Sequence, residues 1–184
     1  MNASGGQRAE LAGDHGGDVA GCDGFPDKSA AASGSFVRLR ALAADLIARR
    51  LEGGCYCGAV RYVAEGEPVL RAQCHCRACQ YFSGGAPNLF MLVPAEGFAY
   101  TKGAPETYRR PDKADAVTRE FCAVCGTHMI SRRPGLRPVV LKIGTLDDSS
   151  VYRGAQKAIF TAEGQPFHLI ADGVPAFEGL PSRQ

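Results

Sequence analysis

The sequence predicts an all-β domain of short antiparallel strands that is organised around clusters of cysteine. Short runs of strand-forming residues recur from residue 51 onward, and turns that contain Gly and Pro separate them. Beyond residue 50, no segment keeps a helical spacing of apolar residues over ten positions. Seven of the eight cysteines fall in three short clusters, so we expect metal ions to tie the strands together.

Length and composition indicate one globular domain with some additional residues. The chain has 184 residues, of which 45% are apolar and 22% are charged, as in ordinary globular proteins. No stretch approaches 18 uninterrupted apolar residues, so no membrane span is expected. The formal net charge of +2 and the lack of Trp give no reason to expect a nucleic-acid partner. The oligomeric state stays open.

Residues 1–50 are expected to form a flexible extension that the chemistry does not need. Residues 1 to about 34 are rich in Gly, Ala, Ser and Asp, which predicts disorder and leaves Cys22 as a free thiol. Residues 36–50 have helical spacing interrupted by arginines, so a short amphipathic helix and chance composition both stay open. Neither segment has the form of a secretory signal. We therefore expect a cytoplasmic protein whose zinc-binding domain covers residues 51–180.

The strands are expected in a regular succession along this domain. Residues 59–63 form the first expected strand, which ends at a turn over residues 65–68. Residues 69–73 lead into the central cysteine cluster, and a flexible loop at residues 83–87 follows it. The other expected strands are residues 89–93, 98–101, 106–109, 117–121, 127–131, 139–143 and 158–161. Those at 117–121 and 127–131 are expected to be the two arms of a hairpin.

Counting thiols divides the clusters into two metal sites. The outer clusters supply one pair each, and the central cluster supplies three thiols. The pairs are Cys55 with Cys57 and Cys122 with Cys125, and the central thiols are Cys74, Cys76 and Cys79. Two pairs complete the tetrahedral set of a structural zinc site, whereas three thiols leave a zinc ion with an open position, as in catalytic sites. We therefore expect two zinc ions per chain.

Local geometry supports this grouping. Tetrahedral coordination with Zn–S distances near 2.3 Å places the sulfurs roughly 3.8 Å apart. Residues i and i+2 of a straight strand are about 6.6–6.8 Å apart, so the chain must bend at Cys55–Cys57. Gly53, Gly54 and Gly58 flank that pair and allow the bend. The Cys122-x-x-Cys125-Gly126 segment has the form of a zinc knuckle, in which the glycine can adopt a left-handed conformation.

Two other uses of the cysteines are less consistent with the sequence. Disulfides would require an oxidising compartment, for which the sequence carries no signal. A redox-active Cys-x-x-Cys would account for one cluster and leave the other two unexplained.

Several short motifs occur in order between residues 51 and 180. They are residues 54–62 (GCYCGAVRY), 74–79 (CHCRAC), 83–86 (SGGA), 121–128 (FCAVCGTH), 144–148 (GTLDD) and 172–178 (DGVPAFE). In these motifs the chain resembles the glutathione-dependent formaldehyde-activating enzyme family, which also includes the centromere protein V-like domains. The chain departs from the commoner family pattern at residues 156–160, where it has Gln-Lys-Ala-Ile-Phe and many members resemble Ser-Lys-Ala-Pro-Trp.

The resemblance implies an Mss4-like β fold and a zinc-dependent reaction. It implies that the four outer cysteines hold a structural zinc ion and that Cys74, Cys76 and Cys79 hold the catalytic one. Members that are enzymes add glutathione to formaldehyde, giving S-hydroxymethylglutathione, and are classed as carbon–sulfur lyases. Zinc can hold a thiol as the nucleophilic thiolate at neutral pH. Three thiolates weaken the Lewis acidity of the ion, so we favour capture of the glutathione thiol over activation of the carbonyl.

Other polar residues are weaker candidates. His75 lies between two expected ligands, and its side chain is expected to point away, in a supporting or surface position. His128 and His168 are expected on strands, in ordinary packing. The possible partners of glutathione carboxylates are Arg77, Arg109, Arg119 and Arg132, although solvated surface charge explains them equally. Residues 83–86 could present backbone amides to a ligand or form a plain loop.

Two functions remain open at this point. The first is a zinc-dependent enzyme that acts on glutathione and formaldehyde or a related small electrophile. The second is a non-catalytic zinc-binding module of the same family. Three central thiols without a fourth favour the enzyme, because a purely structural site is normally closed by a fourth protein ligand.

Overall fold

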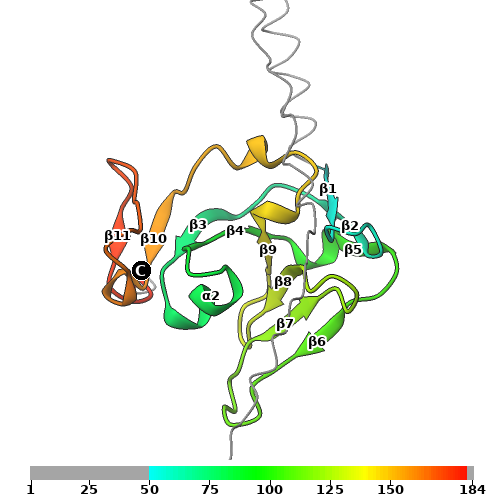
Figure 1. The fold of residues 1–184 in the computed structure, drawn as a ribbon. Helices are drawn as coiled ribbons and strands as arrows, with labels where there is room; N and C mark the ends of the chain where they lie inside the picture. The colour runs from blue at the N-terminus through cyan, green and yellow to red at the C-terminus, as the bar shows by residue number, and fades with distance from the viewer. Residues whose placement is uncertain (1–49, 182–184) are drawn as a thin grey trace, which may run out of the picture.

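Two β-sheets make up residues 50–181, the part of the chain that the computed structural model describes (Figure 1). The small sheet has the order β1-β2-β5, and the large sheet has the order β11-β10-β3-β4-β9-β8-β7-β6. The strands of the small sheet are β1 (Arg50–Gly54), β2 (Arg61–Glu65) and β5 (Phe98–Lys102). Those of the large sheet are β3 (Leu70–Cys74), β4 (Asn88–Val93), β6 (Glu106–Tyr108), β7 (Thr118–Phe121), β8 (His128–Arg132), β9 (Val139–Lys142), β10 (Lys157–Ile159) and β11 (Ala176–Phe177).

Few helical residues interrupt the strands. The single α-helix of the described residues is α2 (Arg77–Phe82), which Figure 1 shows beside the large sheet, between β10 and β7. The 3₁₀ turns are η1 (Ala95–Gly97), η2 (Ile143–Thr145), η3 (Ser149–Tyr152) and η4 (Thr161–Glu163). None of these helices is long and apolar enough to span a membrane. The expected extension over residues 1–50, including Cys22 and the helical pattern of residues 36–50, lies outside the described residues except for Arg50, which begins β1.

The all-β prediction is confirmed, with corrections in detail. Each expected strand has a counterpart, although β2 begins two residues after its expected start. The sequence did not predict β1, β3, β11 or α2. The expectation of antiparallel pairing holds except at β10, which pairs in parallel with both β3 and β11. The chain reaches β10 by a long connection through η2 and η3, and β11 by a second connection through η4, and each connection lets the strands pair in parallel.

The main core lies between the two sheets. Alternate residues of the large sheet point toward it, among them Met91 and Val93 of β4 and Val139 and Leu141 of β9. The small sheet contributes Leu51, Tyr62 and Ala64 to the same cluster. The opposite face of the large sheet carries a second cluster around Ala72, Cys74 and Phe90, against which Cys76 and Cys79 pack. One face of the large sheet therefore packs in the main core, and the opposite face supports the central cysteines.

Gly53 is required where the small sheet meets η2. A Cβ atom at this position would lie 2.2 Å from the carbonyl oxygen of Thr145 and 2.4 Å from the hydroxyl of Tyr62. The side-chain hydroxyls of Tyr62 and Thr145 are joined by a 2.8 Å hydrogen bond in the core. We expect Gly53→Ala to lower the free energy of unfolding by about 2–3 kcal/mol, measured by urea denaturation. Gly144→Ala is the control, since its Cβ would meet nothing within 4 Å. Equal stability of the two variants would contradict this account.

Candidate metal centres

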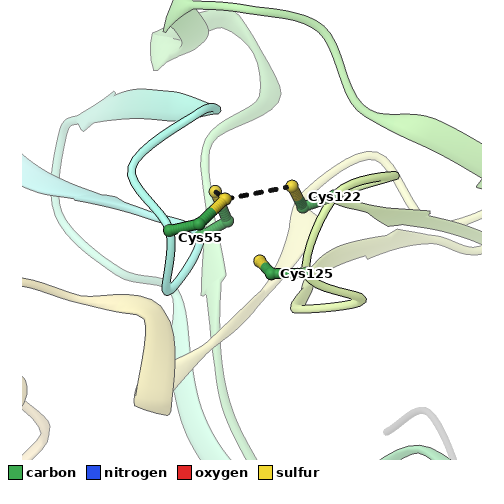
Figure 2. Close-up of side chains that lie close together, drawn as sticks. Cys55, Cys122 and Cys125 are labelled. Atoms are coloured by element: carbon green, nitrogen blue, oxygen red, sulfur yellow. Dashed lines mark hydrogen bonds between the residues drawn. The ribbon is translucent and has the colours of Figure 1, made fainter.

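Four cysteines from two distant loops meet at one point. Cys55 and Cys57 lie in the loop between β1 and β2, and Cys122 and Cys125 lie in the turn between β7 and β8. All four sulfur atoms lie within 4.8 Å of one another. The Cys55–Cys57 and Cys57–Cys122 sulfur distances are 3.5 and 3.8 Å. Figure 2 shows Cys55 on one loop facing Cys122 and Cys125 on the other.

Backbone hydrogen bonds shape both loops around these sulfurs. Gly58 and Gly126 adopt positive φ angles of 70° and 72°, which turn each loop after its cysteines. The amide of Val60 donates to the Cys55 sulfur at 3.2 Å. The Thr127 hydroxyl accepts from the amide of Tyr56 at 3.1 Å and lies 3.2 Å from the Cys125 sulfur, so it joins the two loops. Its hydrogen bond lowers the pKa of Cys125 to about 5, which favours the thiolate form that binds metals.

The other three thiols form a second group at the junction of β3 and α2. Cys74 ends β3, Cys76 precedes the first turn of α2, and Cys79 lies within the helix. Their sulfur atoms also lie within 4.8 Å of one another. Among residues 50–181, no further Cys, His, Asp or Glu belongs to this group. Hydrogen bonding with Cys74, and then with Cys79, lowers the pKa of Cys76, whereas the pKa of Cys74 is raised, so the negative charge of the group is favoured on Cys76.

Buried amide and imidazole groups hold this junction in place. The side-chain amide of Gln80 donates to the carbonyl oxygens of His75 at 2.6 Å and Glu163 at 2.8 Å. His75 is 1% exposed, and its Nδ1 lies 3.0 Å from Nδ1 of His168. His168 in turn bonds through Nε2 to the carbonyl oxygen of Gly85. These contacts attach the segment after η4 to the loop that carries the thiols.

Two cations lie within electrostatic range of the three thiols. Lys142, at the end of β9, is on the face of the large sheet opposite the main core. Burial lowers the pKa of Lys142 to about 8, and the negative charge of Cys79 acts in the opposite direction. Burial likewise lowers the pKa of Arg119 in β7, and the charges of Cys79 and Cys76 oppose that shift. Both cations therefore stabilise negative charge on the thiols.

A cavity of about 780 Å³ opens beside α2. Its walls come from α2, from strands β6 to β8 and from the turn of the four-cysteine group. The lining residues are Arg77, Ala78, Tyr81, Phe82, Tyr108, Arg110, Arg119, Phe121, Gly126 and His128. Burial lowers the pKa of His128 to about 3, so the His128 side chain is neutral at pH 7.

The other predicted candidates have mixed outcomes. His128 begins β8, as expected for a strand residue. The strand prediction for His168 is wrong, because the chain turns there, with a hydrogen bond from its amide to the carbonyl of Gln165. The surface alternative for His75 is also wrong. The loop at residues 83–86 folds on itself, since the Ser83 hydroxyl lies within hydrogen-bond distance of the carbonyl oxygens of Cys79 and Ala86.

The four candidate arginines separate into two kinds. Arg132 bonds to Glu120 at 2.6 Å, and Arg109 donates to the backbone carbonyl of Ala114. Arg77 and Arg119 line the cavity. Lys142 was missed altogether, although a charged residue at the end of the most apolar strand was a signal in the sequence.

The donor sets fit zinc. Both groups consist of sulfur alone, which favours zinc over magnesium or calcium. The 3.5 and 3.8 Å sulfur distances of the four-cysteine group are close to the spacing of roughly 3.8 Å that tetrahedral Zn–S coordination requires. Each group could therefore hold one metal ion.

Comparison with known proteins identifies the family. The family model described as glutathione-dependent formaldehyde-activating enzyme matches residues 50–163, which include all seven cysteines of the two groups. A search of curated proteins gave no match. Among solved structures, the chain is similar to a Rhodobacter sphaeroides protein at 18% identity and a TM-score of 0.43, over 52% of this chain and 87% of that one. With the match covering more than half of its length, the chain belongs to the glutathione-dependent formaldehyde-activating enzyme family.

Proposed function

We propose that the protein is a zinc-dependent carbon–sulfur lyase that joins the thiol of glutathione to formaldehyde or a related small electrophile. The observation that carries the proposal is the three-thiol group, which has no fourth ligand among the described residues and lies beside two cations. A site built only for structure would normally be closed by a fourth protein ligand. Family membership supports the substrates, and the reducing cytoplasm is the compartment in which such thiols persist.

The two cysteine groups would divide the work between stability and chemistry. Cys55, Cys57, Cys122 and Cys125 would hold a structural zinc ion that joins the β1–β2 loop to the β7–β8 turn. Cys74, Cys76 and Cys79 would hold a second ion, for a total of two per chain. A zinc ion bound there would supply an open coordination position that accepts a thiol as thiolate.

Two cationic residues of the chain would stabilise the negative charges that form on sulfur and oxygen in the reaction. Lys142 and Arg119 lie near the three thiols and offset their negative charge, which makes a further thiolate less costly to hold. In the reaction, the glutathione sulfur forms a bond to the carbonyl carbon of formaldehyde. The electron pair of the C=O bond moves to oxygen, and the oxygen then takes a proton from water, which replaces the one that the thiol released on binding. Lys142 would stabilise the negative charge on that oxygen before the proton arrives.

Glutathione binding tests this proposal. We expect glutathione to bind as the thiolate and to release a proton, so its affinity should rise about tenfold per pH unit below the free thiol pKa of about 8.5 and level off above it. S-Methylglutathione keeps the carboxylates but has no ionisable thiol, and should bind at least tenfold more weakly. In the cobalt-substituted protein, glutathione should strengthen the sulfur-to-metal absorption, and formaldehyde should then perturb it. No spectral change at millimolar glutathione would favour the non-catalytic zinc-binding module instead.

A further inference from the structure

We propose that the cavity between α2 and strands β6–β8 binds the carboxylate and the apolar, preferably aromatic, group of a substrate, with Arg119 as the residue that pairs with the carboxylate. The cavity volume of about 780 Å³ is typical of sites for drug-sized molecules and is far larger than formaldehyde requires. The chemical class assigned is thus an organic anion with an apolar body. Calling this ligand a substrate rests on the proposed function, whereas its binding does not.

Arg119 is a buried cation without a carboxylate partner among residues 50–181. It is 9% exposed, and among residues 50–181 no carboxylate lies within ion-pair distance of its guanidinium. Its one protein hydrogen bond in this region is a long one, 3.5 Å to the carbonyl oxygen of Val117. The guanidinium lies 4.1 Å from the centre of the Phe82 ring, which fixes its position by a cation–π contact. A buried guanidinium without a carboxylate partner favours bidentate binding of a ligand carboxylate.

The alternation of β7 explains why Arg119 faces the cavity. Its neighbour Glu120 points to the other side of the sheet, where it accepts hydrogen bonds from Tyr100 at 2.7 Å and Arg132 at 2.6 Å. Glu120 is therefore engaged elsewhere and cannot neutralise Arg119. None of the ten lining residues carries a carboxylate, and Arg77 adds a second cation, whereas Arg110 is paired with Asp112. The charge of the cavity thus selects anions.

The aromatic residues that line the cavity favour a ligand with an apolar group. Four of the lining residues are aromatic, namely Tyr81, Phe82, Tyr108 and Phe121. Tyr81 is 76% exposed, and Phe82 and Tyr108 are 43% and 45% exposed, which is unusual for rings gathered at one site. Formaldehyde is too small to cover these rings. A ligand with an aromatic or branched apolar body would remove them from water.

The cavity adjoins the three-cysteine group through α2. Arg77 and Ala78 line the cavity, and they lie between Cys76 and Cys79 in the sequence. Arg119 is close enough to Cys79 and Cys76 for their charges to act on it. The cavity therefore lies beside the helix that carries Cys79.

Three probes test the chemical class by calorimetry on the full, zinc-loaded chain. The probes are 3-phenylpropionate, its neutral amide 3-phenylpropionamide, and acetate. We expect 3-phenylpropionate to bind at least tenfold more tightly than either of the others, because only it has both a ring and a carboxylate. Equal affinity for the acid and the amide, or no detectable binding of the acid at millimolar concentration, would overturn the proposal.

Two variants locate the binding site. Arg119→Met should reduce the affinity for 3-phenylpropionate at least tenfold, to the level of the amide. Tyr81→Ala, at an exposed position where unfolding is not expected, should weaken both ring-containing probes several-fold. Arg133→Met removes an exposed cation outside the cavity and should change neither. Unchanged binding in both Arg119→Met and Tyr81→Ala would overturn the assignment.

Cys76→Ser separates this proposal from the proposed function. It should abolish the response to glutathione in the cobalt-substituted protein and leave the affinity for 3-phenylpropionate within about twofold of wild type. If Cys76→Ser keeps the glutathione response while the probes bind as expected, the proposed function fails and the cavity assignment stands. If the probes show no preference while Cys76→Ser loses the response, the cavity assignment fails and the proposed function stands.

Discussion

Replacing Cys122 by Ser should leave the purified protein without a cooperative unfolding transition. Cys122 is 1% exposed, lies in the main core and supplies one of the four sulfurs that join the β1–β2 loop to the β7–β8 turn. Structural zinc contributes on the order of 10–16 kcal/mol in small zinc domains, whereas a whole domain is stable by about 5–15 kcal/mol. Losing the ion should therefore cost most of the folding free energy. Circular dichroism on heating and the soluble yield on expression measure the effect.

Chelation offers an independent check on the same expectation. Removing all metal from the wild-type protein at neutral pH should abolish its unfolding transition, and adding zinc under reducing conditions should restore it. A metal-free wild type that melts at the same temperature as the loaded protein would show that the four-cysteine group does not hold the domain together.

Replacing Cys79 by Ser should have the opposite pattern, with activity lost and the fold retained. Cys79 lies on α2, outside the main core, in the smaller cluster on the other face of the large sheet. The variant should fall from two zinc ions per chain to one by elemental analysis, because two thiols rarely retain zinc against buffer. Catalysis of glutathione addition should fall to the uncatalysed rate. The melting temperature should stay within a few degrees of wild type.

Comparison of the two cysteine variants decides between the assigned roles. Cys122→Ser and Cys79→Ser are the same chemical change in the two groups of thiols. If both unfold the domain, or if both leave it folded with one zinc ion, the division into a structural and a catalytic site is wrong.

The sequence predicts those strands whose own residues carry a strong pattern. Residues 139–143 form an apolar run, and the structure has β9 at Val139–Lys142. β1 was not predicted, because Gly53 and Gly54 lack the side chains that mark a strand and are there to allow a close approach to Thr145 and Val60. α2 has six residues, which is less than two turns, so it gives no helical periodicity.

In the same way, the sequence predicts the parts of the site that depend on neighbouring residues and misses those that depend on residues far apart in the chain. The cysteines are grouped by their spacing along the chain and by the number of ligands that zinc takes, and both can be read without a fold. Lys142 and Arg119 approach the thiols only because β9 and β7 lie in the same sheet as β3. His75 and His168 meet across 93 residues. No pattern in the sequence reports such a pairing, because it depends on the order of strands in the sheet.

The parallel pairing of β10 with β3 also sets the order in which the two metal groups can form during synthesis. The four-cysteine group needs no residue beyond the β7–β8 turn, so all of its ligands are present before β8 and the following residues are synthesised. The contacts that hold Cys74, Cys76 and Cys79 in place extend to residue 168. The amide of His75 donates to the carbonyl of Ile159, and the imidazole of His75 contacts that of His168. These contacts require residues that are synthesised late, and they close long loops. The four sulfurs of the first group can therefore meet before the contacts that hold the loop of Cys74, Cys76 and Cys79 are complete.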